Sequence, residues 1–272
     1  IPGSLVGSEM CIRDRTHTAG SLSCFDVYDY RDGSIPSNGS SMAHGASIVV
    51  QDIVSAEGWV PPENVSELLA EAAMYGSIIH SNSWGDDTTA YTARSGEFDA
   101  WSKQMPWSLA FVAPGNTGGA MLEPANARNV AAIGVSTKSV SPEKWPSSSI
   151  GPTPSGTFGI FALAPGVSIQ SAKADGISDS YNNDLKSSSG TSMSTPTAAS
   201  FAGVVQQMVQ DGWFVGSNER LTNQNLTSMS PVWANLSNNS ILLGEGFYPS
   251  GPLLKALLSI ATTSIGTSEN YT

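Results

Sequence analysis

Short β-branched runs alternate with helical patterns along the chain, and this alternation limits the fold more than any other feature. Residues 46–54 (ASIVVQDIV) have the length of a strand. Residues 64–75 follow, with Val65 and Ala72 on one helical face behind an Asn cap. Strands that alternate with helices predict βαβ units and a mostly parallel sheet covered on both faces. Further strand-like runs lie at 77–85, 108–116 and 130–136, and a short helical stretch lies at 95–104.

The length of the chain suits one large α/β domain, since 272 residues are enough to bury a sizeable core. We therefore expect a three-layer αβα fold with a mostly parallel central sheet. A buried helix should begin near Ser192, where residues 192–209 are apolar almost all round, and residues 251–263 supply a last helix. Functional residues should gather beyond the carboxyl ends of the strands, where open α/β sheets bind ligands.

The charge of the chain excludes some classes of partner. Its formal net charge of −11 repels phosphate backbones and anionic lipid surfaces. No apolar run approaches the roughly 20 residues that span a bilayer. We therefore expect neither a nucleic-acid nor a membrane partner. The two cysteines, Cys11 and Cys24, are too few to define a disulfide framework.

The segment SSSGTSMSTPTAAS, residues 187–200, sets a Gly-Thr-Ser turn directly before the apolar helix. A serine nucleophile needs a base for its proton and donors for the oxyanion, and a helix N-terminus supplies such donors. Gly190 would let a substrate carbonyl approach the backbone closely. From these residues alone, Ser192 is either a nucleophile or an ordinary N-cap serine.

Several short motifs together resemble those of the subtilisin-like serine proteases, the subtilases. GTSMSTP (190–196) resembles their nucleophile motif, APGN (113–116) their oxyanion motif and SNSWG (81–85) their substrate-binding strand. The resemblance implies a serine endopeptidase that forms an acyl-enzyme on Ser192, with Asn116 and the Ser192 N–H as the oxyanion hole. Further stretches follow the family in its order at 124–136, 147–156 and 163–172.

The resemblance also implies where a substrate binds. Two backbone segments would pair with an extended peptide and wall its primary specificity pocket. They are Ser83, Trp84 and Gly85 on one side, and Ala113, Pro114 and Gly115 on the other. We expect the Trp84 side chain to lie beside the pocket. Pro114 departs from the family, which usually has a small residue there, and proline lacks an N–H.

The family resemblance implies further properties of the protein. Its partners would be extended peptides or protein substrates, and we expect a monomer that is secreted to the extracellular space. The motifs VVQDI and IHSNSWG most resemble the alkaline secreted proteases within the family. No cofactor or catalytic metal is required. Calcium is a common structural ion of the family, and residues 178–185, or Asp86 with Asp87, are candidate oxygen ligands; solvated loops are the alternative.

The family's general base and its partner carboxylate are missing from their usual positions. THTAGSL (16–22) resembles the second half of the family's histidine motif, but Asp14 and Arg15 precede it. Residues 1–15 show no helical or strand period, and their end resembles a translated sequencing adapter. We therefore interpret residues 16–272 as a partial catalytic domain, cut at both ends. Without a catalytic Asp and His, the chain should be essentially inactive.

The three histidines of the chain are poor candidates for the base of Ser192. His17 corresponds to a structural histidine of the motif, and His44 runs directly into a strand. His80 lies inside the substrate-binding strand and is too close to Ser83 to swing round. No histidine is therefore expected to serve Ser192.

Two other functions stay open beside the protease. One is a non-catalytic domain that holds peptides without cutting them. The other is an acid-acting relative that uses Glu and Asp in place of His and Asp, with Glu67 and Glu71 on one helical face as conceivable carriers. The motifs SNSWG and VVQDI argue against the acid-acting alternative.

Overall fold

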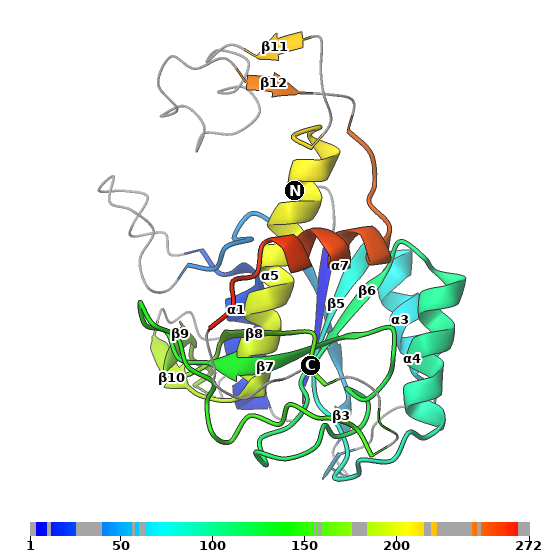
Figure 1. Cartoon of the computed structure of the whole chain (residues 1–272), viewed down its shortest axis with the longest axis vertical. Coiled ribbons are helices and arrows are strands. Elements are labelled where there is room, and N and C mark those ends of the chain that lie inside the picture. Colours follow the sequence, from blue (N-terminus) through cyan, green and yellow to red (C-terminus); the bar gives the residue numbers. More distant parts are fainter. Residues whose placement is uncertain are drawn as a thin grey trace.

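A six-stranded sheet forms the centre of the computed structural model, and helices cover both of its faces (Figure 1). The order across the sheet is β2-β1-β5-β6-β7-β8, and every neighbouring pair is parallel. The strands are β1 (Ser4–Glu9), β2 (Ser47–Asp52), β5 (Ser77–Ser83), β6 (Leu109–Val112), β7 (Ala131–Ser136) and β8 (Ala162–Pro165). The structure describes residues 4–9, 12–25, 40–55, 58–59, 64–154, 156, 159–175, 184–214, 219–221, 241–243 and 246–265.

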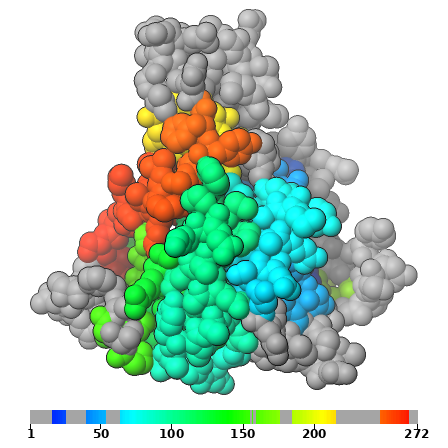
Figure 2. Space-filling view, turned by 90° about the vertical axis from the view of Figure 1, so that its right-hand side faces the viewer, coloured from blue at the N-terminus to red at the C-terminus, as the bar shows by residue number. Residues whose placement is uncertain are grey.

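The described helices are divided between the two faces of the sheet. α1 (Ile12–Ser23), α5 (Thr191–Gln210) and α7 (Gly251–Ile260) cover one face. α3 (Val65–Met74) and α4 (Ala93–Gln104) pack side by side over the other, as Figure 2 shows. This arrangement confirms the predicted α/β fold with a parallel central sheet. None of the described helices is long and apolar enough to cross a bilayer.

Successive side chains of the central strands point to opposite faces of the sheet. In β6, Leu109 and Phe111 join the core beneath α5 and α7, whereas Ala110 and Val112 join the core beneath α3 and α4. All four side chains are buried. A near-continuous apolar strand is what a sheet covered on both faces requires, which is why these runs do not alternate with polar residues.

The strand-like and helical patterns of the sequence are confirmed. Each strand-like run contains a strand of the sheet, and the two helical stretches form α3 and α4. Asn64 caps α3, because its side chain accepts a hydrogen bond from the Glu67 N–H at 3.3 Å. The helices expected near Ser192 and at 251–263 are α5 and α7.

Part of the first fifteen residues forms regular structure, although these residues show no helical or strand period in the sequence. Ser4–Glu9 form β1, which pairs with β2 on one side and β5 on the other, and α1 begins at Ile12. An interior strand of a parallel sheet finds backbone partners on both sides. Its formation therefore does not require a periodic side-chain pattern, which is the signal that sequence reasoning uses.

Three small antiparallel pairs accompany the main sheet in the described residues. β9 (Ile169–Ala172) pairs with β10 (Leu185–Ser188), and this ribbon leads directly into the turn before α5. The other two pairs are β3 (Val54–Ser55) with β4 (Gly58–Trp59), and β11 (Glu219–Leu221) with β12 (Ile241–Leu243).

Candidate active site

The turn before α5 presents Ser192 at the start of a long helix. The helix begins at Thr191 behind its N-cap, Gly190, whose φ of 147° is a conformation that L side chains rarely adopt. Since Gly190 is the N-cap, the interpretation of Ser192 as an ordinary N-cap serine is wrong. Ser192 is half-buried, and its N–H, in the first helical turn, has no carbonyl partner within the helix. Hydroxyl and N–H thus lie together at the positive end of the helix dipole.

Asn116 reaches the same turn from the segment after β6. Its Oδ1 accepts hydrogen bonds from the Thr191 N–H at 2.9 Å and from the Thr191 hydroxyl at 3.1 Å. Because two donors converge on this atom, it must be the amide oxygen, and Nδ2 is left as a donor. A Cβ added at Gly190 would lie 3.5 Å from Asn116 Nδ2, so this donor lies against the turn that carries Ser192.

The carboxyl ends of β5 and β6 lie beside the turn, at the edge of the sheet where ligands bind. The Ser83 hydroxyl, at the end of β5, donates to the Ser192 carbonyl at 3.1 Å. The Ala113 N–H donates to the Asn82 carbonyl at 2.9 Å. The segments 83–85 and 113–115 therefore leave the sheet next to each other and next to Ser192.

The segment 113–115 has few backbone groups left for a peptide. The Pro114 carbonyl accepts from the Leu122 N–H at 3.0 Å, and the Gly115 carbonyl accepts from the Ser149 N–H at 3.0 Å. The Ala113 N–H is bonded within the sheet edge, and Pro114 has none. This segment is therefore better suited to line a pocket than to pair with a peptide strand.

The Trp84 side chain, expected beside the specificity pocket, lies in the core instead. It is buried in the core beneath α3 and α4, with its ring centroid 6.2 Å from that of Phe98. The indole N–H donates to Asn82 Oδ1 at 3.1 Å, and the Arg94 guanidinium lies over the ring at 5.8 Å. Burial of so large an apolar ring is favourable, so the side chain serves the core and only the Trp84 backbone can face a peptide.

Arg94 ties the loop after β5 to the segment at 121–124. Its guanidinium pairs with the Asp86 carboxylate and lies 3.4 Å from Oε1 of Glu123. Glu123 is only 2% exposed, and its other oxygen accepts from the Thr92 hydroxyl at 2.6 Å. The Asp86 N–H also donates to the Glu123 carbonyl at 3.1 Å. Sequence reasoning missed this network, because its members have no local pattern in common.

Two of the histidines have structural contacts away from the nucleophile turn. His17 is buried, and its Nε2 lies 3.0 Å from the carbonyl oxygens of both Ile169 and Lys186. This agrees with the structural role expected for it. His44 stacks on Phe25 with ring centroids 5.1 Å apart, shortly before β2 begins.

The third histidine, His80, lies in β5 and is fully buried. Its ring makes an edge-to-face contact with Trp101 of α4, at a centroid distance of 6.2 Å. Neither ring nitrogen has a hydrogen-bond partner, and the Trp101 indole N–H is already donated to the Ser108 hydroxyl at 2.9 Å. Burial lowers the pKa of His80 to about 3. The ring is thus a neutral core group on the face opposite α5.

The acid-acting alternative finds no support in the contacts of its two carboxylates. Glu67 accepts from the Asn64 amide at 2.9 Å, and Glu71 accepts from the Gln51 amide at 2.8 Å. Both glutamates belong to α3, which covers the face opposite α5. They are therefore separated from Ser192 by the sheet.

No group of three or more His, Cys, Asp or Glu side chains able to hold a metal ion occurs in the described part of the chain. Asp86, one of the candidate calcium ligands, pairs with Arg94. Most of the other candidate stretch, 178–185, lies outside the described residues.

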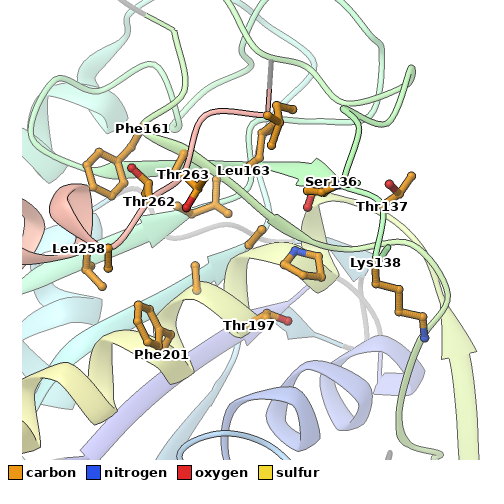
Figure 3. A pocket seen from close by; sticks show the side chains of 18 of the residues that line it. Ser136, Thr137, Lys138, Phe161, Leu163, Thr197, Phe201, Leu258, Thr262 and Thr263 are labelled. Carbon is orange, nitrogen blue, oxygen red and sulfur yellow. The ribbon is translucent and has the colours of Figure 1, made fainter. Parts of the chain in front are cut away.

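An apolar cavity of about 980 Å³ lies between β8, α5 and α7 (Figure 3). Leu163 lines it from β8, Phe201 from α5 and Leu258 from α7. Its lining includes neither Ser192 nor Asn116 and carries no nucleophile paired with a base. The cavity is therefore separate from the candidate active site. The sequence contains no pattern that predicts this cavity, because its lining residues come from segments that are distant in sequence.

Comparisons with known proteins identify a family and a fold for the chain. Residues 3–239 match the model of the subtilase family, Peptidase_S8. Among solved structures, the chain is similar to the prenylagaramide maturation protease PagA, with 19% identity, a TM-score of 0.57, and 95% of this chain and 94% of that chain covered. It is also similar to the self-cleaved protease domain of PatA, with 20% identity, a TM-score of 0.56, and 78% and 75% covered. No curated protein matches.

Proposed function

The chain belongs to the subtilase family of serine proteases, and on this premise we propose that its site binds an extended peptide and forms an acyl-enzyme on Ser192. The Ser192 oxygen gives up its proton and attacks the peptide carbonyl, and the C–N bond then breaks as the amine leaves with a proton from solvent. Water finally hydrolyses the ester, which releases the acid and restores the Ser192 hydroxyl. Asn116 Nδ2 and the Ser192 N–H hold the oxyanion. The observation that carries the proposal is the pair of hydrogen bonds from Thr191 to Asn116 Oδ1, which orient the amide beside the nucleophile.

The oxyanion donors supply a large part of the expected rate. Removing one such donor costs about 10²–10³-fold in turnover, a value measured in subtilisin itself. The donors are held before a substrate arrives: Gly190 accommodates the amide, and the helix fixes the Ser192 N–H. No rearrangement is then needed as charge develops on the carbonyl oxygen.

The peptide itself pairs with residues 83–85, which continue from β5. The segment 113–115 lines the pocket for the side chain that precedes the scissile bond. Its two occupied carbonyls, at Pro114 and Gly115, support this division of roles between the two walls.

Peptide-bond cleavage by this chain should nonetheless be very slow. The contacts of His17, His44 and His80 support the absence of a base, so the Ser192 proton must pass to solvent. Loss of the base costs about a million-fold in turnover and leaves about 10³–10⁴-fold over water from the oxyanion hole and binding. The same contacts favour, as the second candidate function, a domain that holds peptides without cutting them.

Acyl transfer from p-nitrophenyl acetate tests the nucleophile directly, because an activated ester needs little help from a base. We expect slow acetylation of the tryptic peptide that contains Ser192, at a rate proportional to hydroxide concentration between pH 7 and 9. Ser192→Ala should abolish the adduct, and Asn116→Leu should slow its formation by about 10²-fold. Mass spectrometry of the digested protein measures both effects.

Two results would contradict the proposal in different ways. An acetyl adduct that persists on this peptide in Ser192→Ala shows that another group reacts. A fluorophosphonate label on Ser192 at the rate of an active serine hydrolase shows that a base is present after all, and only the inactivity is then refuted.

A further inference from the structure

The apolar cavity between β8, α5 and α7 has the size of a ligand site, although it is separate from Ser192. Its volume of about 980 Å³ lies at the upper end of the range of about 300–1,000 Å³ for small-molecule sites. Figure 3 shows the side chains of Phe161, Phe201 and Leu258 gathered on the left of the view. Burial of an apolar ligand against these side chains is favourable, because it removes their surface from water.

The hydroxyls in the wall of this cavity offer little to a polar ligand. The Thr197 hydroxyl donates to the Met193 carbonyl at 2.9 Å, and the Thr262 hydroxyl donates to the Ser259 carbonyl at 2.7 Å. Both protons are therefore already used by neighbouring backbone. A ligand that fills this space must be mostly apolar, since a polar group in it would lose its hydrogen bonds to water.

Lys138 is the only charged side chain among the described residues that line the cavity. It lies on the right of the view beside Ser136 and Thr137, on the side away from Leu258 (Figure 3). Its Nζ donates to the Ser168 carbonyl at 2.6 Å, and none of the ion pairs between described residues includes it. An ammonium group has three protons to donate, so two remain for water or a ligand.

A second, smaller cavity of about 250 Å³ adjoins the apolar one at Lys138. Met42, Lys138 and Thr197 line both cavities. The smaller one also has the polar side chains of Ser41 and Gln170 in its lining. A charged group beside Lys138 can therefore keep water around it while an attached apolar chain leaves the water. A single anionic group at the end of an apolar body is the ligand chemistry that matches this arrangement.

We propose that the cavity binds a free fatty acid, with its alkyl chain against Phe201 and Leu258 and its carboxylate beside Lys138. The proposal does not depend on the protease function, because the cavity shares no residue with the Ser192 turn. The net charge of the chain is −11, so attraction of an anion must come from Lys138 itself rather than from the summed field. The same summed field repels an anionic membrane surface, which favours a free fatty acid over the acyl chain of a membrane lipid.

Isothermal titration calorimetry of the full-length chain at pH 8 tests the site with three probes: decanoate, octanoate and the uncharged 1-decanol. Decanoate should bind about 15-fold more tightly than octanoate, since each of its two further buried methylenes contributes about fourfold. Lys138→Met should weaken decanoate binding about twofold to fivefold, as expected for an exposed ion pair, and leave 1-decanol binding unchanged. Lys103→Met removes an exposed lysine of α4 and is the control, which should change the binding of neither probe.

Ala198→Phe tests the place of the alkyl chain. Ala198 is half-buried on α5 and lines the cavity, so a larger side chain there fills part of the space. Binding of decanoate and of 1-decanol should both weaken at least about tenfold. Ala70→Phe, at a half-buried alanine of α3, is the control and should weaken neither. Thermal unfolding verifies that each variant is folded, and Lys138→Met, at an exposed residue, tests the proposal even if Ala198→Phe does not fold.

Three results would overturn the proposal. Decanoate that does not bind, or that binds equally well to folded Ala198→Phe, shows that the cavity holds no alkyl chain. An equal change for decanoate and 1-decanol in Lys138→Met shows that the ligand is not an anion held by Lys138. Self-association of the wild type in sedimentation velocity that Ala198→Phe abolishes shows that a second copy of the chain covers the cavity instead. None of these results bears on acyl transfer to Ser192.

Discussion

Replacement of His80 by leucine should make the protein more stable, and by a larger margin in acid. The folded state keeps the ring neutral, since burial lowers the pKa of His80 from 6.5 to about 3. Between these two values the unfolded chain binds a proton that the folded chain does not. The contribution of His80 to the free energy of unfolding therefore falls as the pH drops below 6.5, by about 1.4 kcal/mol per pH unit, and this loss levels off below pH 3.

The size of the effect follows from this window. At pH 5 the histidine lowers the free energy of unfolding by about 2 kcal/mol relative to pH 8. The leucine variant has no titrating ring and lacks this loss. It also removes two buried nitrogens without hydrogen-bond partners, each of which costs about 1–3 kcal/mol, so it should be more stable at pH 8 as well.

Urea unfolding followed by tryptophan fluorescence at pH 5 and pH 8 measures the difference. All other titrating groups are common to the two proteins, so their contributions cancel when the variant is compared with the wild type at each pH. We expect the stability advantage of His80→Leu to grow by about 2 kcal/mol from pH 8 to pH 5. An advantage that is the same at both pH values would refute the reasoning, because the ring would then be able to take up a proton in the folded state.

Two further predictions concern the frame of the site. Arg94→Met should lower the free energy of unfolding by about 3 kcal/mol, since it leaves the buried Glu123 carboxylate without its cation; an unchanged urea midpoint would contradict this. Gly190→Ala should cost about 1–3 kcal/mol, because a φ of 147° is strained for an L side chain. It should also shift the side-chain amide signals of Asn116, because the new Cβ would lie in van der Waals contact with that amide, 3.4 Å from Oδ1. Gly76→Ala is the matched control, as its φ is also positive but nothing lies within 4 Å; an equal shift of the Asn116 signals in both variants would count against the contact.

Much of the layered fold follows from local patterns, because β2, β5, β6 and β7 and the helices α3, α5 and α7 carry apolar signatures of their own. The strand at 108–116 illustrates this: Leu109, Ala110, Phe111 and Val112 are all apolar, and all are buried because both faces of the sheet are covered. β1 could not be predicted from a side-chain pattern, because its residues show none and the strand is held by backbone pairing with β2 and β5.

The candidate site is predictable only as far as its turns extend. The Gly-Thr-Ser turn and the Pro-Gly-Asn turn resemble motifs of the subtilase family, and this resemblance, rather than the composition of the turns, is what identifies Ser192 and Asn116 as candidate site residues. The Trp84 side chain could not be placed in this way, because its burial depends on Phe98 and Arg94 from another element. The Arg94–Glu123 contact carries no sequence signal of its own, since it joins segments that are distant in sequence.

The interior position of β1 affects how the protein is made. β1 precedes both of its partners in the chain, and the register that joins Ser4 to Ser77 forms only after β2 and α3 have been synthesised. During translation β1 is therefore synthesised before both of its partners, and its backbone edges stay unpaired until β2 and then β5 have been made. The centre of the sheet closes across a long loop, so its assembly should be a slow step in folding, and chaperones have most reason to act before β5 emerges.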